Sequence, residues 1–348
     1  MSTTTTTFQT RFGEVHTKPQ SKPGEFTSIP VVDVADMDSD SPQDRQRLAK
    51  EIYRVATTMG FLFAQNHGVS EESIQEIHNM AHKFFALPHE VKMETFVGKN
   101  NRFRGFYPQA RDVPEDAHPH LKATAGKSTE AFNIGYEVAG DPAKTPDHAE
   151  PTDPWGLHGP NQWPREELIP GFREAYLQYY GQILTFCRKL LRIFALALDL
   201  PETYFDHMCK NPGAASRLIR YSACRADQTA AEVPPHTDFG FFTILSQDAV
   251  PGLEVLNSEK EWIKAPSIPG TFVVNIGDMF AYWTNGLFKS TPHRAINRTS
   301  QERFSIPLFF SMDYQTRVAP MEKFVSDTNP PIIEPFVYGE WTRRHTKD

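Results

Sequence analysis

The stretch from Arg217 to Phe310 consists of short runs of alternating apolar and polar residues, separated by closely spaced turn-forming residues. Apolar residues at every second position are the mark of a strand with one buried face. The runs cover residues 217–224, 235–246, 252–256, 262–265, 271–276, 290–297 and 303–310. Many short strands with turns at this spacing are typical of an antiparallel sandwich or barrel. We therefore expect this half of the chain to be mainly β.

The longest helical pattern in the chain lies before these strands. It runs from Phe172 to Leu198 and ends at Pro201. At 1.5 Å per residue it spans about 40 Å, enough to brace one whole face of a sheet.

The N-terminal half mixes shorter elements. Strands are expected at residues 27–34 and 61–64, and Ser41 and Ser70 are the expected N-caps of two helices. Residues 103–153 are loop-rich, and such a segment either covers a pocket or merely connects. One piece of this segment, around residues 130–135, resembles a strand.

These patterns divide the chain into three parts. Residues 1–25 begin with a threonine tract and are expected to be a disordered leader, with a weak transit peptide as the alternative. Residues 26–160 form an N-terminal α/β region, and residues 161–348 hold the long helix and the β core.

Composition limits the classes of partner. The 348 residues carry a net charge of −7, which argues against nucleic acid, and no apolar run reaches the roughly 20 residues of a membrane span. The three cysteines are too few for a disulfide framework, so we expect a reducing, cytoplasmic compartment. A small molecule is the expected partner, and the sequence leaves the oligomeric state open.

His236-Thr237-Asp238 is the candidate metal site. In a strand, residues i and i+2 point to the same side, so His236 and Asp238 are able to bind one ion. His293 supplies a third ligand if the intervening strands fold the chain back. Two histidines and one carboxylate are the ligand set of non-haem Fe(II) oxygenases. An isolated His-x-Asp is more often an ordinary strand, so the surrounding residues decide.

Arg303 and Ser305 form the candidate carboxylate receptor. They share one face of a strand, where a guanidinium and a hydroxyl donate charge-assisted hydrogen bonds to a carboxylate. A hairpin turn centred near Arg298 would place His293 opposite Arg303. The alternative for Arg303 is a surface ion pair with Glu302 or Asp313.

Together these motifs resemble the isopenicillin N synthase-like 2-oxoglutarate/Fe(II) dioxygenases. The resemblance runs from about Ile29 to Trp341 and rests on His236-Thr237-Asp238, Val274-Asn275-Ile276-Gly277-Asp278, Thr291-Pro292-His293-Arg294, Arg303-Phe304-Ser305, Gly60-Phe61, Asn66-His67-Gly68-Val69 and Lys83-Phe84-Phe85. It implies a double-stranded β-helix (jelly-roll) core braced by the long helix.

The same resemblance implies the cofactors and their ligands. Iron would be bound by His236, Asp238 and His293, and 2-oxoglutarate by Arg303 and Ser305 with help from Tyr221. The implied activity is oxidation of a small organic molecule with Fe(II), 2-oxoglutarate and O2, releasing succinate and CO2. Two alternatives stay open: an Fe(II) oxidase or oxygenase of this fold that uses no 2-oxoglutarate, and a non-catalytic β-sandwich binding protein.

Three residues are candidates for substrate binding. Arg217 shares strand parity with Tyr221, and its position resembles one that thymine-hydroxylase-like members use for a substrate carbonyl; the alternative is an internal pair with Glu130. Phe239 could stack on a flat ring, and Phe310 is an expected wall residue. Together they predict a planar substrate such as a nucleobase or a natural-product intermediate. Other expected apolar walls are Phe241, Leu245, Phe272 and Leu308.

Overall fold

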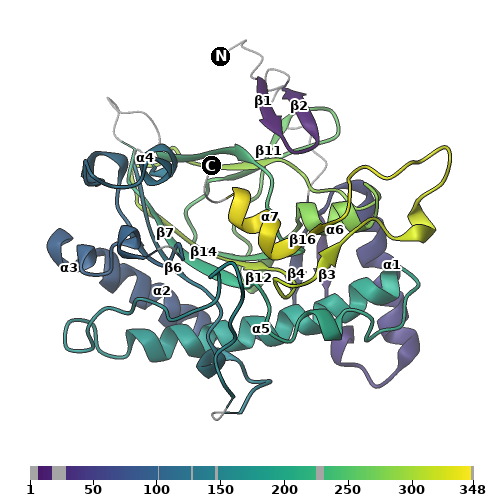
Figure 1. The fold of residues 1–348 in the computed structure, drawn as a ribbon, viewed down its shortest axis with the longest axis horizontal. Coiled ribbons are helices and arrows are strands. Elements are labelled where there is room, and N and C mark those ends of the chain that lie inside the picture. The colour runs from purple at the N-terminus through teal and green to yellow at the C-terminus, as the bar shows by residue number, and fades with distance from the viewer. Residues whose placement is uncertain are drawn as a thin grey trace.

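Two β-sheets packed face to face form the centre of the molecule, and helices cover the outer face of the larger sheet (Figure 1). The computed structural model describes residues 7–17, 29–100, 102–126, 128–145, 148–224 and 231–345. The expected mainly β jelly-roll core, with helices around it, is confirmed.

The larger sheet has eight strands and the smaller has four. The order in the larger sheet is β3 (Val31–Asp33), β4 (Phe61–Gln65), β12 (Thr271–Ile276), β9 (Phe242–Gln247), β14 (Arg303–Phe310), β7 (Ala215–Tyr221), β6 (Thr129–Ile134) and β5 (Gly105–Tyr107). The order in the smaller sheet is β11 (Trp262–Lys264), β10 (Leu253–Leu256), β13 (His293–Asn297) and β8 (Ala231–His236). Only the β3–β4 pair of these two sheets is parallel.

The helices include the three that the sequence predicts. They are α1 (Pro42–Thr58), α2 (Glu71–Phe85), α3 (His89–Met93), α4 (Pro119–Thr124), α5 (Phe172–Ala197), α6 (Asp278–Trp283) and α7 (Tyr338–His345). The expected caps are confirmed, since the Ser41 and Ser70 hydroxyls accept from backbone N–H groups in the first turns of α1 and α2. Short 3₁₀ turns lie at Ala35–Asp38, Val97–Lys99, Ala110–Asp112, Val138–Gly140, Asp206–Met208 and Glu322–Phe324.

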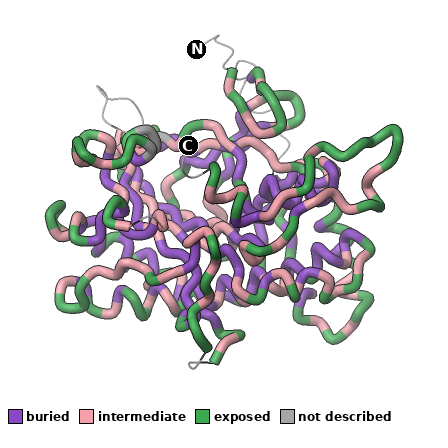
Figure 2. Tube along the Cα trace, viewed as in Figure 1, coloured by how far each residue is buried: buried purple, intermediate pink, exposed green. Residues whose placement is uncertain are grey.

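Helix α5 braces the larger sheet as expected. It lies across the lower part of Figure 1, with α2 towards the left and α1 towards the right. Its buried Phe194 packs on Phe242 of β9, with ring centroids 5.4 Å apart. Figure 2 shows buried residues concentrated in the sheets and on the side of α5 that faces them. The main hydrophobic core therefore lies between α5 and the larger sheet.

The N-terminal segment differs from the expected disordered leader. Residues 7–16 form a hairpin of β1 (Thr7–Thr10) and β2 (Gly13–His16). Phe8 and Phe12 give the hairpin aromatic contacts with the body of the molecule, on Trp262 and Tyr282. These contacts are between residues far apart in the sequence, so a local pattern gives no sign of them. Residues 18–28 lie outside the described ranges.

The expected hairpin around Arg298 is wrong. Strand β13 pairs with β10 and β8 in the smaller sheet, whereas β14 pairs with β7 and β9 in the larger one. The chain changes sheets between the two strands. A second small hairpin pairs β15 (Arg317–Val318) with β16 (Phe336–Val337).

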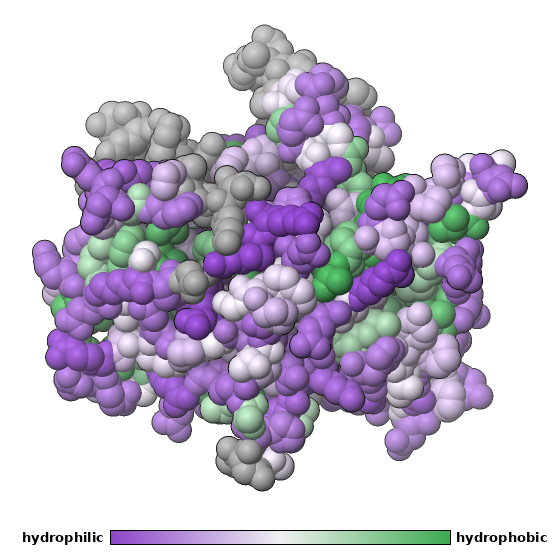
Figure 3. Space-filling model, in the orientation of Figure 1, coloured by the Kyte–Doolittle hydropathy of each residue, from purple (hydrophilic) through white to green (hydrophobic). Residues whose placement is uncertain are grey.

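The face of the molecule in Figure 3 is mostly hydrophilic, with separate hydrophobic patches. Among the described residues, no helix combines the length and apolar character that crossing a membrane requires.

Candidate active site

The three predicted metal ligands meet at one point. His236 ends β8 and His293 begins β13, and the two residues are direct partners in the antiparallel ladder. Asp238 lies just beyond β8, with its carboxylate oxygens 3.6 Å from His236 Nε2 and 3.7 Å from His293 Nε2. The ligand atoms all lie within 4.8 Å of one another. Within the described ranges, this is the one group of histidine, cysteine and acidic residues suited to a metal ion.

Both imidazoles present Nε2 to this point. His236 Nδ1 lies 2.8 Å from the Pro234 carbonyl oxygen, and His293 Nδ1 lies 3.1 Å from that of Thr291. Because a carbonyl only accepts, each Nδ1 carries the proton and each Nε2 has a free lone pair. Burial lowers the pKa of His293 to about 4, which keeps that imidazole neutral. The donor set therefore suits a divalent iron ion.

Two residues that the sequence analysis did not assign hold the Asp238 carboxylate. Its Oδ2 accepts hydrogen bonds from Thr243 Oγ1 at 2.5 Å and from Asn275 Nδ2 at 2.8 Å. Asn275 belongs to one of the motifs that carry the family resemblance, so a signal was present. These two donors fix the carboxylate orientation and leave Oδ1 for a metal.

Asp278 also holds the loop that carries Thr237 and Asp238. Its backbone N–H donates to the Asp238 carbonyl at 2.7 Å, and its Oδ2 accepts from Thr237 Oγ1 at 3.2 Å. Gly277 allows this approach, because a Cβ there would clash with the Gly240 carbonyl. The metal-ligand loop is thus held by fixed backbone contacts.

A cavity of about 120 Å³ between the sheets contains the metal ligands. It is lined by Arg217, Ile219, Tyr221, Val233, His236, Asp238, Thr243, Leu245, Leu253, Asn275, His293, Arg294, Ala295, Arg303, Ser305, Pro307 and Phe309.

 

The seven predicted residues that line this cavity are His236, Asp238, His293, Tyr221, Arg303, Ser305 and Arg217. The other two, Phe239 and Phe310, are not among its lining residues.

Arg303 lines the cavity and is only 1% exposed. Its guanidinium stacks on the Tyr221 ring at 4.7 Å, and Nη2 donates to Gln247 Oε1 at 3.2 Å. Nε and Nη1 are buried without a hydrogen-bond partner. The alternative of a surface ion pair is wrong, since Glu302 binds Arg220 instead. A buried guanidinium with two unused donors requires an acceptor from a ligand.

Arg217 lies further along the same face of β7. Its guanidinium lies over the Tyr107 ring at 4.6 Å, and its Nε is buried without a partner. Asn133, its direct neighbour on β6, has a buried Oδ1 that also lacks a partner. Local sequence patterns did not single out Asn133 or Tyr107, although Asn133 lies in the strand-like piece at residues 130–135.

The alternative for Arg217, an internal pair with Glu130, does not form. Glu130 instead contacts Lys92 at 3.0 Å and Arg220 at 2.6 Å. Arg217 and Asn133 therefore place an unused donor and an unused acceptor side by side on one face of the sheet.

Comparisons with known proteins agree with this geometry. Residues 212–312 match the model of the 2OG-Fe(II) oxygenase superfamily, and residues 29–166 match that of the non-haem dioxygenase in morphine synthesis N-terminal region. The 2-oxoglutarate-Fe(II) type oxidoreductase ppzC of Metarhizium majus (strain ARSEF 297) is 35% identical over 299 residues, covering 82% of this chain and 77% of the relative. The chain belongs to the 2OG-Fe(II) oxygenase superfamily.

A further relative and a solved structure resemble this oxygenase over most of its length. Kihadalactone A synthase LFS of Citrus sinensis is 32% identical over 326 residues, covering 90% of this chain and 92% of the relative. Among solved structures, full-length Neurospora crassa T7H in complex with alpha-KG and 5-formyluracil superimposes with a TM-score of 0.73 at 25% identity. That match covers 92% of this chain and 96% of T7H. The expected cofactors, Fe(II), 2-oxoglutarate and O2, are those of this superfamily.

Phe310 does not line the cavity of the oxygenase. It lies on the opposite face of β14, in the hydrophobic core, with its ring 5.2 Å from that of Phe242. Phe309 lines the cavity instead. Residues 303 and 305 have the parity of 309, so strand alternation explains the error. Phe272 and Leu308 are core residues for the same reason. Phe241, which precedes β9, is also a core residue, although it has the parity of the cavity-lining Thr243 and Leu245. Leu245 is the one expected wall residue that lines the cavity.

Phe239 is also placed differently from the expectation. Its ring is 39% exposed and contacts Arg11 and Trp341, with the Arg11 guanidinium 4.1 Å from the ring centre. The expected stacking of a substrate ring on Phe239 therefore has to compete with Arg11 for the same aromatic surface.

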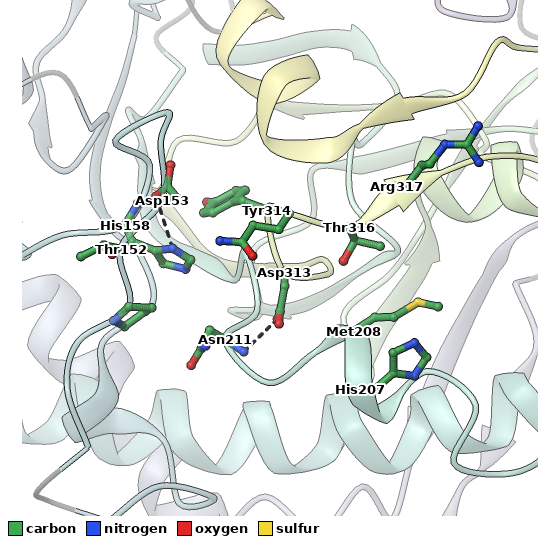
Figure 4. Close-up of a pocket in the computed structure, with 12 residues that line it drawn as sticks. Thr152, Asp153, His158, His207, Met208, Asn211, Asp313, Tyr314, Thr316 and Arg317 are labelled. Carbon is green, nitrogen blue, oxygen red and sulfur yellow. Dashed lines mark hydrogen bonds and ion pairs between the residues drawn. The ribbon is translucent and has the colours of Figure 1, made fainter.

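The oxygenase has a second, larger cavity of about 440 Å³ that contains none of the metal ligands (Figure 4). Within it, His158 Nδ1 lies 3.3 Å from the Asp153 carboxylate, and Asp313 accepts from the Asn211 backbone N–H at 2.8 Å. Burial raises the pKa of Asp313 to about 6. Size alone does not mark the reaction site, because the metal ligands and the unpaired arginines lie in the smaller cavity.

Proposed function

We propose that this oxygenase binds Fe(II) through His236, Asp238 and His293, and 2-oxoglutarate through Arg303 and Ser305. The unused donors of Arg303 carry this proposal, because a buried guanidinium beside a metal site is suited to a dicarboxylate that also reaches the metal. Bound iron supplies the activation of O2, coupled to the conversion of 2-oxoglutarate into succinate and CO2.

The residues around Arg303 prepare it for a carboxylate. Tyr221 stacks on the guanidinium and Gln247 holds one nitrogen, so the remaining donors keep a fixed direction. Gly252 leaves the space for this side chain, since a Cβ there would lie 2.7 Å from Arg303 Cδ. Ser305, on the same face of β14, adds a hydroxyl donor to the carboxylate.

The substrate is proposed to bind at the Arg217 end of the cavity. Arg217 offers a donor and Asn133 an acceptor on neighbouring strands, and the Tyr107 ring lies beneath the guanidinium. A planar group that presents an acceptor next to a donor, such as the CO–NH edge of a nucleobase or lactam, satisfies both. T7H, which binds 5-formyluracil, supports a substrate of this kind.

Apolar side chains of the cavity exclude water from the reacting centre. Leu245, Leu253, Val233, Pro307 and Phe309 contribute hydrocarbon surface around the metal ligands. The cavity lining thus combines a buried guanidinium that suits a carboxylate, the three proposed metal ligands and the Arg217 guanidinium.

The test is succinate release from anaerobically iron-loaded enzyme on addition of O2, 2-oxoglutarate and candidate planar amides or aromatic acids. For the best substrate, Arg217→Ala should lower kcat/KM. The corresponding loss of transition-state stabilisation should be about 1.5 to 3 kcal/mol, because a hydrogen bond to a charged group is lost. The KM for 2-oxoglutarate should stay unchanged.

Arg220→Ala is the matched control. Arg220 is an arginine on the same strand that is paired with Glu130 and Glu302. Turnover without 2-oxoglutarate would contradict the cosubstrate assignment, and equal losses in the two variants would contradict the role of Arg217.

A further inference from the structure

The N-terminal hairpin is docked beside the metal site. Strand β1 lies against β8, which ends at the metal ligand His236. Phe8 stacks on Trp262 of β11 with centroids 5.9 Å apart, and Phe12 contacts Tyr282 of α6 at 5.2 Å. The hairpin therefore has aromatic contacts both through β1 and through its turn.

Arg11, at the turn of the hairpin, joins three other segments. Its guanidinium lies 4.1 Å from the Phe239 ring centre and 4.4 Å from that of Trp341 in α7. Its Nε lies 3.4 Å from Asp278 Oδ2. The Phe239 and Trp341 rings also touch each other edge to face, with centroids 5.5 Å apart. One side chain thus connects the hairpin, α7 and the metal-ligand loop.

Two of the residues that Arg11 contacts, Phe239 and Asp278, are close to the metal ligands. Phe239 directly follows Asp238, and Asp278 donates its backbone N–H to the Asp238 carbonyl. The Asp278 side chain is fully buried, whereas that of Arg11 is 23% exposed. The ion pair is therefore sheltered from water, where cation–π and charge–charge contacts are strongest.

The most exposed of the three metal ligands is the one on the strand that the hairpin contacts. The His236 side chain is 38% exposed, whereas those of His293 and Asp238 are only 10% and 5% exposed. The hairpin lies against the strand of His236, and α7 reaches Phe239 through Trp341. In Figure 1, α7 lies in front of the sheets, and the hairpin projects beside the smaller sheet.

We propose that Arg11 is a positioning residue that fastens the hairpin and α7 together as a two-part cover over the His236 side of the metal site. The cover controls access to the metal and holds Phe239 in place. The inference rests on the proposed function only in taking His236, Asp238 and His293 as the metal ligands.

The first test measures whether Arg11 couples the two parts, and it needs no metal. Trypsin cleavage after Arg343 and Arg344 in α7 should be about three- to tenfold faster in Arg11→Ala than in the wild type, because loss of the cation–π contacts releases the helix. Conversely, Trp341→Ala should speed cleavage after Arg11 in the hairpin. Gln9→Ala, an exposed change in β1, is the matched control and should alter neither rate.

The second test measures access to the metal. Excess EDTA should remove Mn²⁺ from the loaded Arg11→Ala protein several-fold faster than from the wild type, and Arg11→Lys should lie between them because it keeps the charge but not the planar stacking. Unchanged cleavage of α7 would overturn the coupling, and faster cleavage with an unchanged rate of metal removal would overturn the cover. Failure of the wild type to bind metal would count against the proposed ligands, while the trypsin arm would still decide the coupling.

Discussion

The two faces of the larger sheet have opposite character, although they are made by the same strands. On β14, Phe304, Leu308 and Phe310 point into the hydrophobic core towards α5 and α2, whereas Arg303 and Ser305 point into the cavity. The first face buries hydrocarbon, which stabilises the fold. The second buries a guanidinium with two donors that the protein does not satisfy. Polar groups that folding leaves without partners mark the face on which a ligand completes the structure.

The largest effect is expected at the metal ligands, which face the cavity from the smaller sheet and from the loop after β8. His236→Ala and Asp238→Ala each remove one of three ligands, so Fe(II) affinity should fall by more than about 100-fold and turnover should reach background. The fold should persist, as measured by circular dichroism. His207→Ala, at the second cavity, is the control; similar iron loss in all three variants would contradict the assignment.

Two adjacent residues of β14 compare the faces directly. Phe310→Ala should lower the free energy of unfolding by about 3 to 5 kcal/mol, because it opens a cavity in the core. Phe309→Ala should cost less stability but lower kcat/KM, because Phe309 lines the reaction cavity. Urea unfolding and steady-state kinetics of both variants measure this. Equal losses of unfolding free energy in Phe309→Ala and Phe310→Ala would contradict the difference between the core face and the cavity face of β14.

A smaller effect is expected from His78 of α2, on the helix side of the sheet. Its Nε2 lies 2.9 Å from Ser246 Oγ, and burial lowers its pKa from 6.5 to about 4. Between pH 6.5 and pH 4, His78 is protonated in the unfolded chain but neutral in the folded one. The free energy of unfolding therefore decreases as the pH falls through this range, by up to about 1.4 kcal/mol per pH unit. His78→Gln should flatten this dependence in urea unfolding series, and an unchanged slope would contradict it.

The alternation of residues along strands predicted the metal ligands and the carboxylate-binding residues better than the apolar residues that line the cavity. The i, i+2 rule placed Arg303 with Ser305, because that pair depends on one strand only. It also brought His236 near Asp238, although Asp238 lies just beyond the end of β8. The choice of Phe310 failed because it has the opposite parity to Arg303. The parity rule itself was sufficient to select Phe309.

Contacts between segments that are distant in the sequence could not be predicted from local residue patterns. The hairpin expected around Arg298 did not form because the pairing of a strand depends on its neighbours in the sheet, and β13 and β14 belong to different sheets. The same holds for the ordered β1–β2 hairpin, whose contacts with Trp262, Phe239 and Trp341 come from the other end of the chain.

The most direct test of the central claim is calorimetric titration of 2-oxoglutarate into the anaerobic Fe(II) protein, for the wild type and for Arg303→Met. The wild type should bind one 2-oxoglutarate per chain. The variant should keep its iron and bind 2-oxoglutarate more weakly by about 2 to 5 kcal/mol. Its ligand-free stability should stay within about 1 kcal/mol or rise, because an unsatisfied buried charge is removed. Equal binding of 2-oxoglutarate by both proteins would contradict the claim that the unpaired guanidinium is its receptor.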